Sequence, residues 1–316
     1  MAQIHTKLKY VVSPGQSLVS DQIQSNIIDF FQYGLLEAGH FQNVYVAQSG
    51  ANGDFSKLYP VEDSRFVDGQ VWQAARKNWV YESGLDYQVQ PIQISGVYVN
   101  GTFHPLSGVG TYSHYIDYPN GRVVFNSPIT TTATVKAEYS TRLVEIESVD
   151  CPTFRNALTN SFNANSPQLN WIGSGNWGIN GENRVQFPAV FVEVPPRRSF
   201  TGKELGGGHV VLTDVLFYVV AENSWDRNRL IDIISCQIDK ELYFYDKNKT
   251  PPQLDPNTGS IYSGCILYPN LVQLGSDYLW QKCSILGSRV EGEAQIDLGQ
   301  FTGIVRLTTE LRTNEF

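Results

Sequence analysis

Residues Asp117–Phe125, DYPNGRVVF, have the composition of a tight turn between two β-strands. Asn-Gly pairs favour hairpins because both residues adopt positive φ at low cost. Pro119 lacks an amide hydrogen, so it fits poorly in the first hydrogen-bonded pair of a two-residue hairpin. We expect a three-residue loop that ends at Gly121 in the left-handed region, with Tyr118 opposite Arg122. Such a turn sets a strand register and predicts an antiparallel sheet around it.

Three further Asx-Gly pairs precede this one and extend the pattern over the first half of the chain: Asn52-Gly53, Asp68-Gly69 and Asn100-Gly101. Short runs of β-branched and aromatic residues flank them, such as GVYVNGTF at 96–103, and these residue types are enriched in strands. One pair would be weak evidence, whereas four pairs predict an antiparallel, hairpin-rich β domain. We place this domain at residues 1–148, because the hairpin pattern ends there.

An N-terminal helix accompanies the predicted β domain. Ser20 is a suitable N-cap, Gly39 is a suitable stop, and the apolar residues between them fall on one side of a helix. These residues are Ile23, Ile27, Phe30 and Phe31. We expect this face to pack on a sheet, and core packing is the simplest explanation for it.

The second half, residues 149–316, has a different pattern. Apolar runs at 185–194 and 210–221 predict strands, while the glycine- and asparagine-rich segment 170–184 predicts an ordered surface loop. A short helix is expected after Asp150. The clearest helix begins near Asn223 or Ser224, with Asp226 in its first turn. Its predicted apolar stripe is Leu230, Ile231, Ile234, Ile238 and Leu242. The chain is therefore predicted to be mainly β, with an α+β second domain in which helix packs on sheet.

Composition restricts the classes of partner. The formal charge of −8 argues against general binding of a phosphate backbone, which needs a basic surface. No apolar run is long enough to span a bilayer, and the first residues lack the apolar core of a signal peptide. We therefore expect synthesis in a cytosol and no membrane partner.

The sequence contains no recognisable catalytic or metal-binding motif. The five histidines lack metal-ligand spacing, and HExxH, GxSxG and P-loop patterns are missing. The four cysteines are widely spaced, which predicts buried free thiols. Asp255 and Asn257 lack the further ligands of a calcium loop and predict an Asx turn. We expect no enzymatic activity, no cofactor and no metal.

Residues Tyr112–Tyr118, YSHYIDY, place aromatic side chains beside a carboxylate on one predicted strand. This arrangement is compatible with glycan binding, for which Tyr115 is the candidate contact. Packing of tyrosines across neighbouring strands explains the pattern equally well. Both interpretations remain open at this point.

The segment Pro195–His209 is long for a connection between strands, and such loops are usually functional or disordered. It is locally basic in an acidic protein and rich in glycine. It is either a solvated flexible loop or an arm that orders on a neighbouring subunit, a partner protein or nucleic acid. The candidate partner-docking residues are Arg197, Arg198, Lys203, Gly206, Gly207 and Gly208.

Three stretches, at 53–84, 94–105 and 112–129, together resemble a module in virion proteins of large tailed bacteriophages; the last reads YSHYIDYPNGRVVFNSPI. The second half is similar in outline to neck and tail-completion proteins, with strands, a long loop and the helix within AENSWDRNRLIDIISCQIDK at 221–240. This resemblance implies a non-enzymatic structural subunit of a neck or tail-terminator ring that joins head and tail.

The resemblance also implies a location and partners. The location would be the virion, after synthesis in the cytoplasm of a bacterial host. The partners would be copies of the chain in a ring, other neck, tail or portal-side proteins, and DNA that passes through the channel without specific binding. The alternative is a tail-fibre, baseplate or receptor-binding protein that recognises a glycan, and an uncharacterised hydrolase ranks third.

Overall fold

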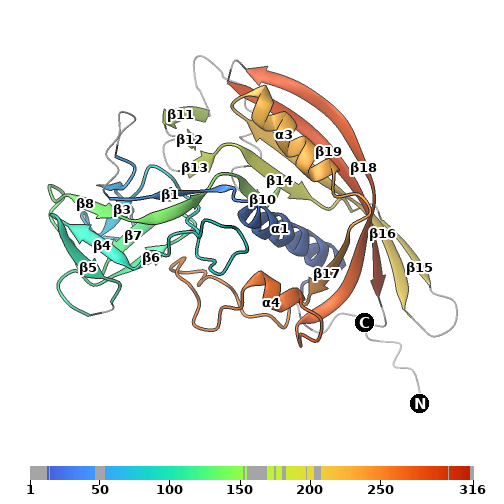
Figure 1. The fold of residues 1–316 in the computed structure, drawn as a ribbon, viewed down its shortest axis with the longest axis horizontal. Coiled ribbons are helices and arrows are strands. Elements are labelled where there is room, and N and C mark those ends of the chain that lie inside the picture. Colours follow the sequence, from blue (N-terminus) through green and yellow to red (C-terminus); the bar gives the residue numbers. More distant parts are fainter. Residues whose placement is uncertain are drawn as a thin grey trace.

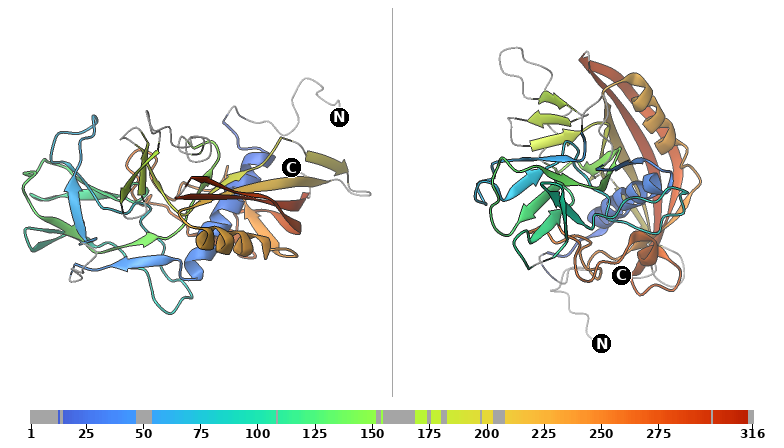
Figure 2. Two further views of the ribbon diagram at one scale, coloured as in Figure 1. Left: turned by 90° about the horizontal axis from the view of Figure 1, so that it is seen from above. Right: turned by 60° about the vertical axis from the view of Figure 1, so that its left-hand side comes forward.

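A computed structural model describes residues 13, 15–46, 54–107, 109–151, 154, 169–173, 176–179, 183–196, 198–202, 208–297 and 299–313. Strands dominate this part of the chain, in two large sheets accompanied by a few helices, which confirms the predicted mainly β fold (Figure 1). The two large sheets lie at opposite ends of the molecule (Figure 2).

The first large sheet has seven antiparallel strands in the order β5-β4-β8-β2-β3-β7-β6. Its strands are β2 (Lys57–Pro60), β3 (Val71–Gln73), β4 (Gly96–Val99), β5 (Thr102–Pro105), β6 (His114–Asp117), β7 (Arg122–Phe125) and β8 (Val135–Ala137). Beside it, β1 (Phe41–Val44) pairs with β9 (Tyr139–Arg142). The core includes Trp72 and Trp79, both almost fully buried, and Trp79 stacks on Tyr139 at 4.4 Å between ring centroids.

The hairpins confirm part of the turn prediction. Asn100 and Gly101 have φ values of +50° and +84° and form a two-residue turn between β4 and β5. In the β6–β7 hairpin, however, Asp117 rather than Tyr118 pairs with Arg122, so the predicted register is wrong by one residue.

The physical reason for this shift is the Asp117 side chain. Its carboxylate accepts hydrogen bonds from the backbone and side-chain amides of Asn120 and closes a longer turn. Gly121 has φ +61°, as predicted. Because the ladder ends at Asp117 and Arg122, Tyr118 lies outside it, and its side chain is in the core, 4% exposed.

The second large sheet follows the order β10-β14-β16-β19-β18-β17, with β15 paired to β16 beside this path. These strands are β10 (Glu145–Ser148), β14 (Ala189–Glu193), β15 (Arg198–Gly202), β16 (His209–Ala221), β17 (Glu241–Tyr245), β18 (Leu279–Asp297) and β19 (Gln300–Thr313). The β10–β14 pair is parallel and the other pairs are antiparallel. Helix α4 (Tyr268–Val272) lies beside β17.

Helix α3 (Ser224–Ser235) packs on the second sheet as predicted, but it is shorter than expected. Asn223 is its N-cap and accepts a hydrogen bond from the backbone amide of Asp226 at 2.8 Å. The predicted stripe is wrong at its C-terminal end, because Ile238 is 47% exposed beyond the helix and Leu242 lies in β17. The turn that follows the helix reverses the chain so that β17 can join the sheet.

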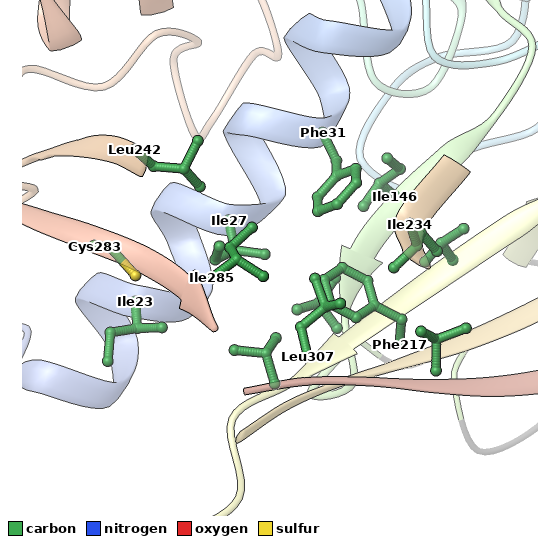
Figure 3. Packing of buried hydrophobic residues seen from close by; sticks show 14 of the residues in the cluster. Ile23, Ile27, Phe31, Ile146, Phe217, Ile234, Leu242, Cys283, Ile285 and Leu307 are labelled. Atoms are coloured by element: carbon green, nitrogen blue, oxygen red, sulfur yellow. The ribbon is translucent and has the colours of Figure 1, made fainter. Parts of the chain in front are cut away.

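Helix α1 (Val19–Glu37) packs its apolar face into the core of the second sheet (Figure 3). Ile23 and Ile27 are fully buried, and the Phe31 ring lies 5.1 Å from that of Phe217. The N-cap is Leu18 rather than the predicted Ser20, because the carboxylate of Asp21 accepts the backbone amide hydrogen of Leu18.

The polar side chains of α1 contact both edge strands of the same sheet. On one side, Gln32 donates to the carbonyl oxygen of Ile146 in β10 at 2.7 Å. On the other side, buried Asn26 donates to the carbonyl oxygen of Tyr245 in β17 and accepts its amide hydrogen, at 3.0 and 2.8 Å. The sheet therefore curls around α1, and the helix satisfies backbone groups at both of these edges.

Packing crosses the predicted domain boundary at residue 148 in both directions. Helix α1 and strand β10 precede that residue and yet belong to the second sheet. Conversely, the loop around Gly259 packs on the β6–β7 hairpin, where the carbonyl oxygen of Gly259 accepts the amide hydrogen of Tyr118 at 3.1 Å. The division at residue 148 stays a prediction.

The predicted surface loop at 170–184 is wrong. A three-stranded antiparallel sheet is found instead, made of β11 (Leu169–Gly173), β12 (Asn176–Ile179) and β13 (Asn183–Gln186). The sequence held a signal for it, because an Asn-Gly pair at 180–181 separates β12 from β13. The expected helix after Asp150 lies outside the described residues apart from Phe154, and so does the Asn52-Gly53 pair.

Candidate docking arm and acidic hollow

Strand β15 and the first half of β16 form a hairpin that projects from the body of the molecule (Figures 1 and 2). The register is continuous from Arg198 opposite Thr213 to Gly202 opposite His209. The sequence predicted a loop here, whereas Ser199, Phe200 and Thr201 extend the sheet instead. We call residues 198–202 and 209–213 the arm.

The six predicted docking residues fall in different places. Arg198 begins β15, and Gly208, with φ +91°, directly precedes β16. The other four lie outside the described residues: Arg197, Lys203, Gly206 and Gly207. Within the part of the chain that the structure describes, Arg198 forms no ion pair.

The arm exposes apolar side chains on both of its faces. Phe200 is 52% exposed and lies opposite Val211. Leu212, on the other face of the hairpin, is 38% exposed. Exposed apolar side chains on a projecting strand mark a surface that another molecule can cover.

The outer edge of β15 differs from the other edges of the second sheet. Helix α1 occupies the edges formed by β10 and β17. The distal part of β18 is interrupted by three register shifts and carries charged side chains, both of which discourage strand addition. These side chains include Arg289, Glu291 and Glu293. Strand β15 has no register shift, and no second strand pairs with it among the described residues.

A hollow of about 620 Å³ opens where α1, the loop at 83–86 and α4 meet. We call it the acidic hollow. Its lining is Tyr33, Glu37, Ser83, Gly84, Asp86, Leu267, Pro269 and Asn270. The loop is held against the helix because a carboxylate oxygen of Glu37 accepts the backbone amide hydrogen of Asp86 at 2.8 Å.

The two charged side chains that line the acidic hollow, Glu37 and Asp86, are both carboxylates. Burial, followed by the nearby carboxylates of Glu37 and Asp86, holds the pKa of Tyr33 well above its usual value. Neither carboxylate pairs with a lysine or arginine in the described part of the chain. Because Leu267 and Pro269 supply apolar wall, the hollow suits a cationic side chain together with an apolar one.

The hollow was not predicted from the sequence. Its carboxylates, Glu37 and Asp86, are far apart in the chain, and its apolar wall comes from a third segment. No local spacing connects these three segments. Phe200 lies within the predicted docking segment but is not one of its candidate residues, because basic charge and glycine content singled out that segment.

The geometry of the proposed glycan-binding strand favours packing. His114, Ile116 and Tyr118 are all less than 5% exposed and belong to the interior of the first sheet. Tyr115, on the opposite face, remains partly exposed. A separate hollow of about 350 Å³ is lined in part by His104 and Tyr112, whose rings lie 4.4 Å apart.

The described residues include no cluster of three or more His, Cys, Asp or Glu side chains that could hold a metal ion. The predicted Asx turn is confirmed, since Asp255 accepts the amide hydrogen of Asn257 at 2.8 Å. None of the four cysteines forms a disulfide in the part of the chain that the structure describes, but only Cys283 is buried, and Cys236 is exposed. Burial raises the pKa of Cys283 to about 12.

None of the helices in the described ranges is long and apolar enough to cross a bilayer. Comparison with protein families, with characterised proteins and with solved structures found no match to this chain.

Proposed function

We propose that the protein is a non-enzymatic structural subunit of a tailed-bacteriophage virion. In this role it is part of a neck or tail-terminator ring that joins head and tail through protein-protein contacts. The observation that supports this proposal most directly is the arm, a projecting hairpin with an uncovered edge and exposed apolar side chains.

The arrangement of the arm and the acidic hollow is compatible with ring formation. The arm lies at the outer end of the second sheet, and α4, which borders the hollow, lies in the body of the molecule (Figure 1). A contact between two different patches is heterologous, and such contacts generate closed rings when the rotation between neighbours closes.

The first experiment is to measure the mass and shape of the purified protein by light scattering and negative-stain microscopy. A closed ring with a central channel is the expected result. A protein that remains monomeric at all concentrations would contradict the ring. An elongated trimer would favour the tail-fibre or receptor-binding alternative, which a glycan array with a Tyr115→Ala control would then examine.

The role of the arm is tested by the substitution Phe200→Ser. We expect this variant to fold normally and to lose ring assembly, because the half-exposed ring lies outside the hydrophobic clusters of the described residues and its removal weakens an intermolecular contact. The matched control is Phe103→Ser, which changes a 42% exposed phenylalanine on β5, the edge strand of the first sheet. Equal assembly of the two variants would remove the arm from the proposed interface.

A further inference from the structure

We propose that the acidic hollow receives the arm of a neighbouring copy of this chain. This inference rests on the proposed ring and identifies the two surfaces that meet in it. Arg198 would lie between the carboxylates of Glu37 and Asp86, and Phe200 would cover the apolar wall formed by Leu267 and Pro269.

Charge complementarity supports a second copy as the occupant. The segment 195–209 holds three basic residues and a single acidic one, whereas the whole chain has a formal charge of −8. Pairing of two arms with each other would bring like charges together. Docking of an arm in the acidic hollow instead places Arg198 beside Glu37 and Asp86. None of these three side chains forms an ion pair among the described residues.

Size and polarity agree with this pairing. A volume of about 620 Å³ lies within the usual range of ligand pockets, roughly 300–1,000 Å³, so two large side chains have room to enter. The arm offers one cationic and one aromatic side chain, two residues apart on the same face of β15. Arginine and aromatic residues are also the side chains that most often anchor interfaces.

The arm of a molecule does not occupy the hollow of the same molecule. Figure 1 shows β15 extending away from α4 and from the helix end that borders the hollow. An intermolecular contact satisfies both surfaces without bending the sheet. Because every copy carries one arm and one hollow, the same contact can repeat from copy to copy around a ring.

The test uses two full-length variants with complementary defects. Arg198→Glu alters the arm alone. The double variant Glu37→Gln, Asp86→Lys alters the hollow alone. The side-chain oxygen of the new glutamine can still accept the backbone amide hydrogen of residue 86. Each variant alone should self-associate at least tenfold more weakly than the wild type, a change of about 1.4 kcal/mol. In a mixture of the two variants, the intact arm of the double variant can still enter the intact hollow of the Arg198→Glu variant. Association should therefore return.

Sedimentation velocity over a concentration series measures both effects. The control is Arg289→Glu, whose side chain is 78% exposed on the other long hairpin and which should assemble like the wild type. If the wild type forms a ring and the mixed variants remain monomeric, the inference is wrong and the proposed ring stands. If neither the wild type nor the mixture associates, both proposals fail.

Discussion

Asp29 on α1 accepts a hydrogen bond from the hydroxyl of Tyr245 at the junction between helix and sheet. Burial raises the pKa of Asp29 from 3.8 to about 6, despite the opposing effect of the tyrosine hydrogen bond. The folded protein therefore binds this proton more tightly than the unfolded chain does. It follows that the contribution of Asp29 to stability falls as the pH rises from about 4 through 6.

The substitution Asp29→Asn removes this titration and keeps an acceptor for the tyrosine hydroxyl. We expect the variant to be more stable than the wild type at pH 8 by about 1–3 kcal/mol, and nearly equal to it at pH 4. Urea unfolding at a series of pH values measures the difference. A gap between the two proteins that does not change with pH would contradict the assignment.

Gly259 shows how one residue can hold two parts of the chain together. It has φ +70°, and a Cβ atom at this position would lie 2.3 Å from a carboxylate oxygen of Asp117. We expect Gly259→Ala to lower the free energy of unfolding by about 2–4 kcal/mol, because the side chain meets both a strained backbone and a steric clash.

Gly84 provides the matched control for that substitution. Its φ is +71°, but a Cβ atom there meets nothing within 4 Å. Gly84→Ala should therefore cost only the backbone strain, about 1 kcal/mol. Thermal or urea unfolding that ranks the two variants equally would show that the contact with Asp117 is not tight.

At the scale of elements, α1 packs in the core of the second sheet and contacts its edge strands β10 and β17. An edge strand presents unpaired backbone groups, and natural proteins cover them with helices, charges or bulges. Asn26 is the clearest example, since it is fully buried and pairs with both backbone groups of Tyr245. The helix thus has a polar role in addition to its apolar one.

The substitution Asn26→Leu preserves the size of the side chain and removes both hydrogen bonds to Tyr245. We expect a loss of about 2–4 kcal/mol, because two buried backbone groups lose their partners. Faster amide exchange confined to β17 would accompany this loss. Ser25→Ala is the control, since its hydroxyl accepts an exposed hydrogen bond from the amine of Lys247 and its loss should change stability little.

Local signals in the sequence predicted elements with local causes. The Asn100-Gly101 turn, the Asn223 cap and the apolar face of α1 all depend on residues a few positions apart. The elements that differ from the prediction are those whose structure depends on distant partners. Strand β15 exists because β16 extends beyond the body to pair with it, and Leu242 leaves the helical stripe because β18 offers it a strand partner.

At the scale of the whole molecule, the two sheets are not independent. Residues 1–148 contribute α1 and β10 to the second sheet. The Lys77–Glu145 and Arg142–Glu82 ion pairs add buried charge contacts near this junction. Sequence patterns indicate where the hairpins change to a sheet with helices, but they do not reveal which sheet receives the first helix.

This arrangement predicts that residues 149–316 do not fold alone. Loss of α1 removes the burial of Ile23, Ile27 and Phe31, which stabilises the fold by roughly 5–8 kcal/mol. That sum is comparable with the whole stability of a typical domain, about 5–15 kcal/mol. We expect this fragment to show a weak near-UV circular dichroism signal and to bind a hydrophobic dye. Addition of a peptide of residues 15–40 should partly restore the near-UV signal. Cooperative unfolding without the peptide would contradict this expectation.

The candidate site was predicted only in part. Local charge and length singled out the segment that contains the arm, and Arg198 remains a candidate within it. The acidic hollow is formed by three segments, α1, residues 83–86 and residues 267–270, which come together only in the folded protein. No spacing rule connects such segments, so the receiving surface could not be derived from the sequence.

Strand β18 contains three more residues than β19 over the same length of hairpin, one at each register shift. The curvature of this hairpin thus depends on the difference in the number of residues between its two strands, and not on the identity of any core side chain. In evolutionary terms, the loss or gain of a single codon at one of these positions would change the curvature by a discrete step. The pairing on either side would survive, so the shape of the subunit can vary while its interior stays the same.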